Sequence, residues 1–283
     1  MKKIFILIIL TNLVNPVWGQ IKDIPVSELQ RLSFNTEVHG MTAMIGNAAG
    51  LSLFPNDDGA FFNYNFLKPG EQDEINFALT MNNLAFAVQQ FSLDNHTDHD
   101  FMRAYKLGLS VGGKVLSIGT ANKIIEVQSS DRTKQVFSVD VGLIFQPASF
   151  LSLAAHARDL NEPVIENYQF QREYSAGFGI KLFSQRFKIL AEAAWNDDIQ
   201  YFEQARVKTG LSIMPIQNVE LLVGGILKQG IVDILFQNEE FFAILQFPFF
   251  GGIRFLTTTR IDGHWHFLRY SASLLIPLKT IAF

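Results

Sequence analysis

Ionisable side chains recur on one face of several segments in which apolar and polar residues alternate. Lys181, Lys188 and Glu192 show the pattern clearly, because the residues beside them on the other face are apolar. Basic groups outnumber acidic groups, so a lumen lined by this set would attract an anionic solute or a carboxylate. The alternative is a network of paired charges that only fills a narrow interior. The full set is Lys106, Asp140, His156, Arg158, Lys181, Lys188, Glu192, Arg206, Lys208, Glu220, Arg254 and Arg269.

Apolar residues also fall on the face that carries these charges. They could contact an apolar ligand, or they could pack against a segment of the chain that enters the interior. The sequence favours packing but leaves both interpretations open. The residues are Leu190, Leu222, Ile226, Ile244 and Leu256.

No arrangement of residues predicts an enzyme. The chain lacks the Gly-x-Ser-x-Gly and His-Glu-x-x-His motifs and any phosphate-binding glycine loop. Ser152, His156 and Asp159 could be arranged as a catalytic set, but their spacing is not specific. His96 and His99, in the loop Asp94–Asp100, could hold a divalent cation, although such a run is more typical of a solvated loop tip. We therefore expect no catalytic residue, no metal and no cofactor.

The segment Arg172–Asn196 shows what kind of element positions these side chains. It reads REYSAGFGIKLFSQRFKILAEAAWN, two alternating stretches joined by a short turn at 184–185. Successive side chains of a strand point to opposite faces, so each stretch has one apolar and one polar or small face. Each is about ten residues long, which is enough to cross a bilayer at a tilt, whereas strands of soluble sheets usually have about five or six.

The same alternating unit recurs along most of the chain. We predict strands over 60–66, 75–81, 84–92, 103–111, 114–125, 135–145, 150–158, 174–182, 187–196, 203–214, 219–227, 241–247, 252–259 and 265–276. The pattern predicts an all-β fold, a transmembrane antiparallel β-barrel of about 14 strands, with 12 as the alternative. A soluble periplasmic β domain is the competing interpretation.

The connections between these strands alternate in length. Short turns are predicted at 82–83, 112–113, 146–149, 184–185, 215–218 and 248–251, and longer polar connections at 93–102, 126–134, 159–170, 197–202, 228–240 and 260–264. Bacterial barrels place their short turns on the periplasmic side. An even strand number then predicts that both termini lie on that side.

The beginning of the chain and its composition indicate export to the bacterial outer membrane. Residues 1–19 read as a cleaved signal peptide, with Lys2 and Lys3 before the apolar run Ile4–Leu10 and a small residue, Gly19, at the cleavage site. The chain has no cysteine, which excludes a lipoprotein anchor and disulfides. It is 48% hydrophobic, and a net charge of −4 is too mild to indicate a nucleic-acid partner. We expect membrane lipid as its surroundings.

Residues 20–66 alternate poorly and are predicted to form an N-terminal plug, with the barrel over 67–283. Within them, Gly40–Leu67 (GMTAMIGNAAGLSLFPNDDGAFFNYNFL) resembles the N-terminal segment of an outer-membrane group. This group contains the fatty-acid transporter family FadL and the PorV/PorQ proteins of type IX secretion. The resemblance rests on a small-residue stretch from Gly46 to Gly50, an acidic turn at Asp57 and Asp58, and an aromatic run around Asn63, in which Tyr64-Asn65 stands where Pro-Ala is usual.

The resemblance implies two functions. The first is a PorV/PorQ-like accessory in protein secretion or surface attachment, with secretion-system proteins as partners. The second is a FadL-like channel that passes a small hydrophobic or amphipathic molecule. The compact loops favour the first.

Overall fold

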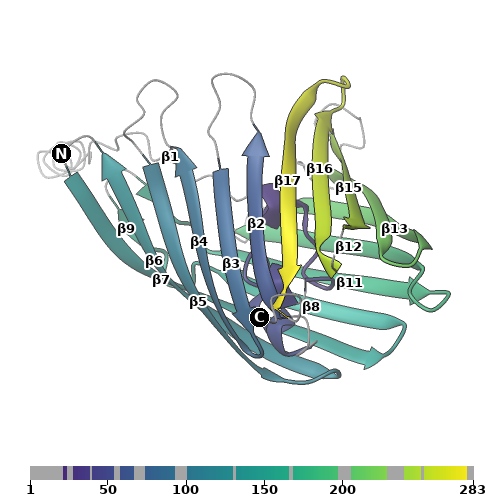
Figure 1. Ribbon diagram of the computed structural model, residues 1–283. Coiled ribbons are helices and arrows are strands. Elements are labelled where there is room, and N and C mark those ends of the chain that lie inside the picture. The colour runs from purple at the N-terminus through teal and green to yellow at the C-terminus, as the bar shows by residue number, and fades with distance from the viewer. Residues whose placement is uncertain are drawn as a thin grey trace, which may run out of the picture.

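The computed structural model describes residues 22–23, 28–38, 40–53, 58–66, 74–92, 101–129, 132–165, 168–196, 205–227, 239–249 and 252–278. Within them, fourteen strands close into one antiparallel barrel. Figure 1 shows these strands arranged around the interior. The predicted barrel of about 14 strands is therefore confirmed. The predicted signal peptide falls outside the described residues. None of the described helices has the length and apolar character to span a bilayer.

The barrel strands follow one another around the wall in chain order, and β17 pairs with β2 to close the ring. They are β2 (Gly59–Phe66), β3 (Glu74–Met81), β4 (Leu84–Ser92), β5 (Phe101–Gly112), β6 (Leu116–Ser129), β7 (Arg132–Ala148), β8 (Leu151–Arg158), β11 (Glu173–Leu182), β12 (Phe187–Asn196), β13 (Arg206–Ile216), β14 (Val219–Leu227), β15 (Glu239–Pro248), β16 (Arg254–Asp262) and β17 (Phe267–Pro277).

The alternation in the sequence sorts side chains to the two sides of the wall. On β11, Phe178 is 42% exposed and faces outward, whereas Ser175 and Gly179 face the interior. On β13, Leu211 is 45% exposed, while its neighbour Ser212 is buried. An apolar outer face and a polar inner face are what a barrel in lipid requires.

Several of the predicted long connections are too long, because strands continue into them. β6 and β7 pair as far as Ser129 and Arg132, inside the predicted loop 126–134, and β16 runs on to Asp262. The outward side chains of this extension, such as Gln128 and Gln135, are polar. The apolar–polar alternation therefore fades although the hydrogen-bond ladder continues.

The N-terminal end of the described chain does not lie at the end of the barrel where it was expected. β2 begins and β17 ends beside the short turns, where Leu278 N–H donates to Asp58 O. By contrast β1 (Lys22–Asp23) pairs in parallel with β10 (Tyr168–Gln169) in a small sheet completed by β9 (Val164–Ile165). That sheet lies in the connection between β8 and β11, at the opposite end. The prediction that both termini lie on the short-turn side is therefore wrong for the N-terminal end.

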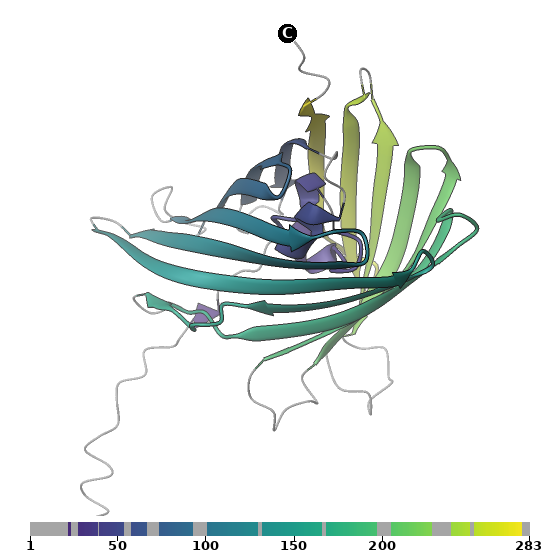
Figure 2. The same ribbon diagram turned by 90° about the horizontal axis from the view of Figure 1, so that it is seen from below.

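The chain reaches β2 by running through the barrel. We call residues 31–38 and 40–53 the inner segment. It begins in the last turn of α2 (Glu28–Leu32) and contains the short helices η1 (Gly40–Thr42) and η2 (Ala48–Ser52). Figures 1 and 2 show it in purple inside the ring of strands. β2 belongs to the wall although it was assigned to the plug, and the division into a plug and a barrel domain stays a prediction.

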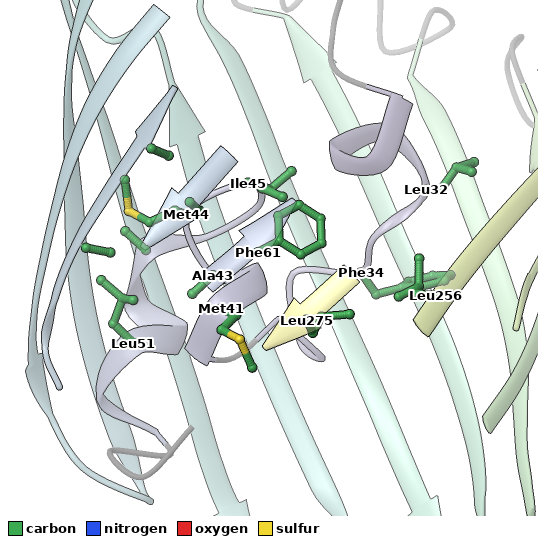
Figure 3. Packing of buried hydrophobic residues seen from close by; sticks show 14 of the residues in the cluster. Leu32, Phe34, Met41, Ala43, Met44, Ile45, Leu51, Phe61, Leu256 and Leu275 are labelled. Carbon is green, nitrogen blue, oxygen red and sulfur yellow. The ribbon is translucent and has the colours of Figure 1, made fainter. Parts of the chain in front are cut away.

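The main apolar core sits in the barrel interior, where the inner segment meets the wall (Figure 3). From the inner segment, Leu32, Met41 and Leu51 are fully buried, and Phe61 and Leu275 come from the wall. Small wall residues make this possible. At Gly108, for example, a Cβ atom would lie 2.0 Å from Met44 Sδ.

Candidate functional site

A cavity of about 110 Å³ lies between the inner segment and the wall formed by β12 and β14 to β17. A cavity of similar size lined by aliphatic and aromatic side chains takes up a small apolar molecule in other proteins. The cavity is lined by Ser33, Phe34, Glu37, Val38, Thr42, Lys188, Glu220, Leu222, Ile244, Gln246, Arg254, Leu256 and Leu275.

One wall of the cavity is apolar. Leu222 pairs in register with Ile244, and Leu256 and Leu275 come from the next two strands. Phe34 faces this wall from the inner segment, and Figure 3 shows it beside Leu256. An aliphatic patch on the inner face departs from the polar lining of a water-filled pore. Ile244 and Leu256 pack in the core and also line the cavity. Their contact with an apolar ligand stays a prediction.

The other part of the cavity is charged. Glu37 from the inner segment forms ion pairs with Lys181 at 3.2 Å and with Lys188 at 3.0 Å. Lys188 also pairs with Glu220 at 2.9 Å, and Ser212 Oγ donates to the same carboxylate. Gln246 and Arg254 complete this polar lining. The cavity is therefore amphipathic.

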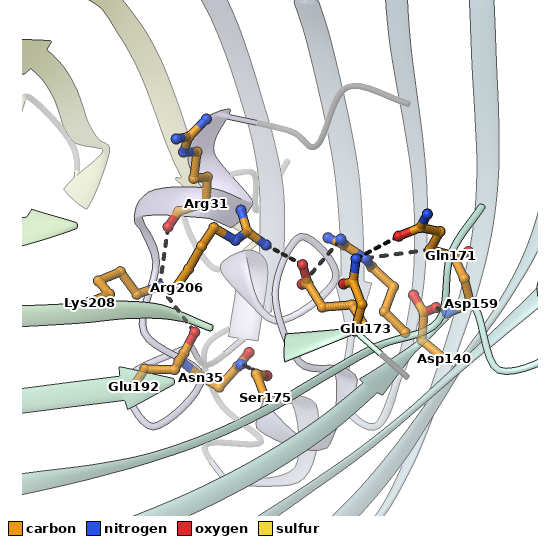
Figure 4. Close-up of polar contacts among 12 residues, drawn as sticks. Arg31, Asn35, Asp140, Asp159, Gln171, Glu173, Ser175, Glu192, Arg206 and Lys208 are labelled. Atoms are coloured by element: carbon orange, nitrogen blue, oxygen red, sulfur yellow. Dashed lines mark hydrogen bonds and ion pairs between the residues drawn. The ribbon is translucent and has the colours of Figure 1, made fainter. Parts of the chain in front are cut away.

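Polar contacts hold the inner segment against the opposite part of the wall (Figure 4). Asn35 N–H donates to Glu192 Oε2 at 2.7 Å, and Asn35 Nδ2 donates to Ser175 Oγ at 2.8 Å. Lys208 Nζ pairs with Glu192 at 3.1 Å and lies 4.7 Å from the ring centroid of Phe34. The segment is thus fixed to β11, β12 and β13, and the cavity lies on its other side.

A separate set of buried ion pairs lies toward the long-connection end. Lys123 Nζ is 2.7 Å from Asp140 and 2.5 Å from Asp159. Glu173 pairs with Arg158 at 3.1 Å and with Arg206. These pairs bring acidic and basic side chains into contact inside the barrel. The choice between a basic lumen and a network of paired charges stays a prediction.

The structure places the sequence-predicted ionisable residues in several groups. Three of them, Lys188, Glu220 and Arg254, line the cavity, and Lys181 pairs with the lining residue Glu37. Two others, Glu192 and Lys208, hold the inner segment. The ion pairs near the long-connection end include Asp140, Arg158 and Arg206. Lys106 is buried opposite Lys123, His156 is buried opposite Ser175, and Arg269 pairs in register with Arg260. Their functional roles stay predictions.

Sequence reasoning missed several partners of these residues. Lys123, Glu173, Glu240 and Arg260 all lie on inward faces, and strand alternation extended by a few residues would have found them. Glu37 gave no such signal, because the inner segment has no regular period. The predicted excess of basic groups is reduced once these acidic residues are counted.

The residues of the predicted plug motif lie at or near the inner segment. Gly46 and Gly50 pack against Val38, and a Cβ atom at Gly50 would lie 2.2 Å from Val38 O. Asp58 accepts a hydrogen bond from Asn82 N–H at 2.6 Å, and Asn63 Nδ2 donates to Ser273 Oγ at 2.8 Å. Asp57 and the histidine loop 94–100 fall outside the described residues. Within the described part of the chain, no cluster of three or more histidine or carboxylate residues could hold a metal.

Comparison with known proteins places the fold. No family model and no curated protein matches the sequence. The P. putida toluene transporter TodX aligns with a TM-score of 0.52 at 11% identity, covering 83% of this chain and 92% of its own. A deltaS2 mutant of the TodX monoaromatic hydrocarbon channel aligns with a TM-score of 0.56 at 10% identity, covering 88% of this chain and 97% of its own. The CymD monoaromatic hydrocarbon channel aligns with a TM-score of 0.53 at 12% identity, covering 89% of this chain and 96% of its own. At these identities the likeness is one of fold: the chain has the barrel architecture of outer-membrane hydrocarbon channels.

Proposed function

We propose that the protein is a FadL-like channel of the outer membrane, which passes a small hydrophobic or amphipathic molecule through its barrel. The observation that carries this proposal is the cavity between Phe34 and the aliphatic wall of Leu222, Ile244 and Leu256. A pore for ions or sugars would leave such side chains in water, which is unfavourable by about 25 cal/mol per Å² of apolar surface.

The fold supports the channel hypothesis over the secretion accessory that the sequence favoured. TodX and CymD are described as hydrocarbon channels, and a cavity with one apolar wall fits a solute of that kind. Partner proteins of a secretion system would instead contact turns and loops, and no contact of the described residues favours that role.

The proposed route passes the cavity side of the inner segment. The segment is tied by hydrogen bonds and ion pairs to β11, β12 and β13. Toward β14 to β17, Arg31 pairs with Glu240 at 2.8 Å, and beyond this ion pair the segment lies against apolar side chains and the cavity. Apolar contacts have no fixed direction, so a solute can replace them more easily than it can replace buried hydrogen bonds.

Filling the cavity tests the proposal. Leu222→Trp places a large ring in the cavity, and the adjacent Leu221→Trp places the same ring on the lipid side, where Leu221 is 39% exposed. We expect cells that carry Leu222→Trp to take up radiolabelled toluene at the rate of cells without the protein. Cells that carry Leu221→Trp should match the wild type. Equal uptake by the two variants would contradict the proposal, provided that a heat-modifiability gel shows both barrels folded.

A further inference from the structure

Two phenylalanine rings meet between the inner segment and the wall, beside the cavity. Phe34 from the inner segment and Phe242 from β15 have ring centroids 6.3 Å apart and planes tilted by 44°. Phe34 is 2% exposed and Phe242 is 3% exposed, so the contact between them is closed to water. Because Phe34 also lines the cavity, the ring pair closes the cavity on the side where Phe242 lies.

This side of the cavity faces the long-connection end of the barrel. On β15, Gln246 and Ile244 line the cavity, and Phe242 is the next inward residue toward the connection between β14 and β15. On β14, Leu222 lines the cavity, and Gly224, the register partner of Phe242, is the next inward residue in the same direction. A solute that follows the proposed route from this end must therefore pass the rings before it reaches the cavity.

Both rings lie on glycine residues of the wall. A Cβ atom at Gly210 would lie 2.9 Å from Phe34 Cζ, and a Cβ atom at Gly224 would lie 2.4 Å from Phe242 Cζ. Gly210 and Gly224 pair in register on β13 and β14, so they lie side by side beneath the two rings. Glycine in a strand permits this close approach and has no side chain to interlock with a ring. At these two positions no wall side chain obstructs a shift of the rings.

A second contact joins the same two elements. Arg31 and Glu240, which precede the two rings in the inner segment and in β15, form an ion pair at 2.8 Å. The Arg31 side chain is 20% exposed, whereas neither ring is more than 3% exposed. The ring pair is therefore the more tightly closed of the two contacts on the route.

We propose that the contact between Phe34 and Phe242 limits the width of the solutes that pass, with Phe242 as the residue that sets this limit. The inference rests on the proposed channel function and adds the residue that sorts its solutes. A narrow aromatic molecule can replace one ring of the pair, because its own ring restores the attraction that the pair loses. A wider molecule has to push both rings apart and restores less of that attraction.

p-Xylene and mesitylene test the inference, because both are methylated benzenes but mesitylene carries methyl groups on three sides and is wider. Cells that carry each variant are given one radiolabelled hydrocarbon at a time, and uptake by cells without the protein is subtracted. The readout is the ratio of mesitylene uptake to p-xylene uptake, because differences in the amount of protein cancel in this ratio.

We expect Phe242→Ala to raise this ratio about two- to tenfold, the change in rate that corresponds to the attraction of one aromatic pair. Phe242→Leu keeps an apolar side chain without a ring, disturbs the packing less, and should raise the ratio by a smaller factor. Phe241→Ala is the matched control, because Phe241 is 39% exposed on the lipid side of the same strand, and the wild-type ratio should persist. A heat-modifiability gel establishes that the compared barrels are folded.

The outcomes separate this inference from the proposed function. An unchanged ratio in Phe242→Ala and Phe242→Leu, together with loss of p-xylene uptake in Leu222→Trp, would overturn the width limit and leave the channel standing. Faster swelling of liposomes in arabinose with Phe242→Ala than with the wild type would also overturn it, because the ring would then only seal a leak for water. Wild-type uptake of p-xylene by Leu222→Trp would contradict the channel function itself.

Discussion

Replacing Gly119 by alanine should push the inner segment away from the barrel wall. The added Cβ atom would lie 2.3 Å from Ala49 N and 2.4 Å from Ala48 C, whereas real Cβ contacts essentially never fall below 3.0 Å. The atoms in the way are backbone, so no side-chain rotation relieves the clash. η2 is also held here by hydrogen bonds of Ser117 to Ala49 O and to Ser52.

The expected loss of stability is about 2 kcal/mol. Overpacking in a filled interior costs about 1–3 kcal/mol, and a strained or broken hydrogen bond at Ser117 adds about 1 kcal/mol. Alanine recovers about 0.5–1 kcal/mol relative to glycine in a strand. Gly225→Ala is the matched control, because its nearest neighbour would be 3.7 Å away. Gly225→Ala should therefore stabilise the protein by about 0.5–1 kcal/mol, because alanine is favoured over glycine in a strand and no clash opposes it.

Guanidinium unfolding of the two variants in detergent micelles, followed by tryptophan fluorescence, measures this difference. The midpoint should fall for Gly119→Ala and stay or rise for Gly225→Ala, with unchanged slopes. Equal midpoints would refute the close contact between the inner segment and β6.

Three further predictions concern charge, turn geometry and capping. Glu240 pairs with Arg260 at 2.6 Å and with Arg31 at 2.8 Å. Glu240→Leu leaves these cations without their partner, so the free energy of unfolding should fall by about 3–5 kcal/mol in the same assay. Adding Arg260→Leu should restore part of this loss. Ser184 has φ 56°, so Ser184→Gly should stabilise by about 1 kcal/mol, and a lower unfolding midpoint would contradict this. Asn47 accepts from Ala49 N–H at 3.0 Å, so Asn47→Ala should cost about 1 kcal/mol and increase protease cleavage of the inner segment, whereas unchanged cleavage would count against the cap.

Strand alternation carries most of the information about the fold. Leu84–Ser92 and Val219–Leu227 begin and end where the alternation predicts, because one face of each strand meets lipid and the other meets the interior. Beyond the apolar belt this contrast disappears, which is why the extension of β6 and β7 to Ser129 and Arg132 was not predicted.

The candidate site was less predictable, because it is made jointly by the wall and by a segment without periodicity. Alternation assigned Lys188 and Leu222 to the inner face, but no pattern in the sequence brings Glu37 or Phe34 beside them. Their position depends on irregular turns and on hydrogen bonds such as Asn35 to Glu192, which only the folded chain reveals. The sequence predicted an N-terminal segment in the interior, but not that the described chain begins at the end of the barrel opposite to the short turns.

The central claim is that the cavity beside Phe34 is the place where a solute binds. Crystals of the protein soaked with 4-bromophenol test it most directly, because the bromine gives an anomalous signal that locates the ring. A bromine peak is expected between Phe34 and Leu256. Bromine peaks confined to the lipid-facing surface, with the cavity empty, would contradict it.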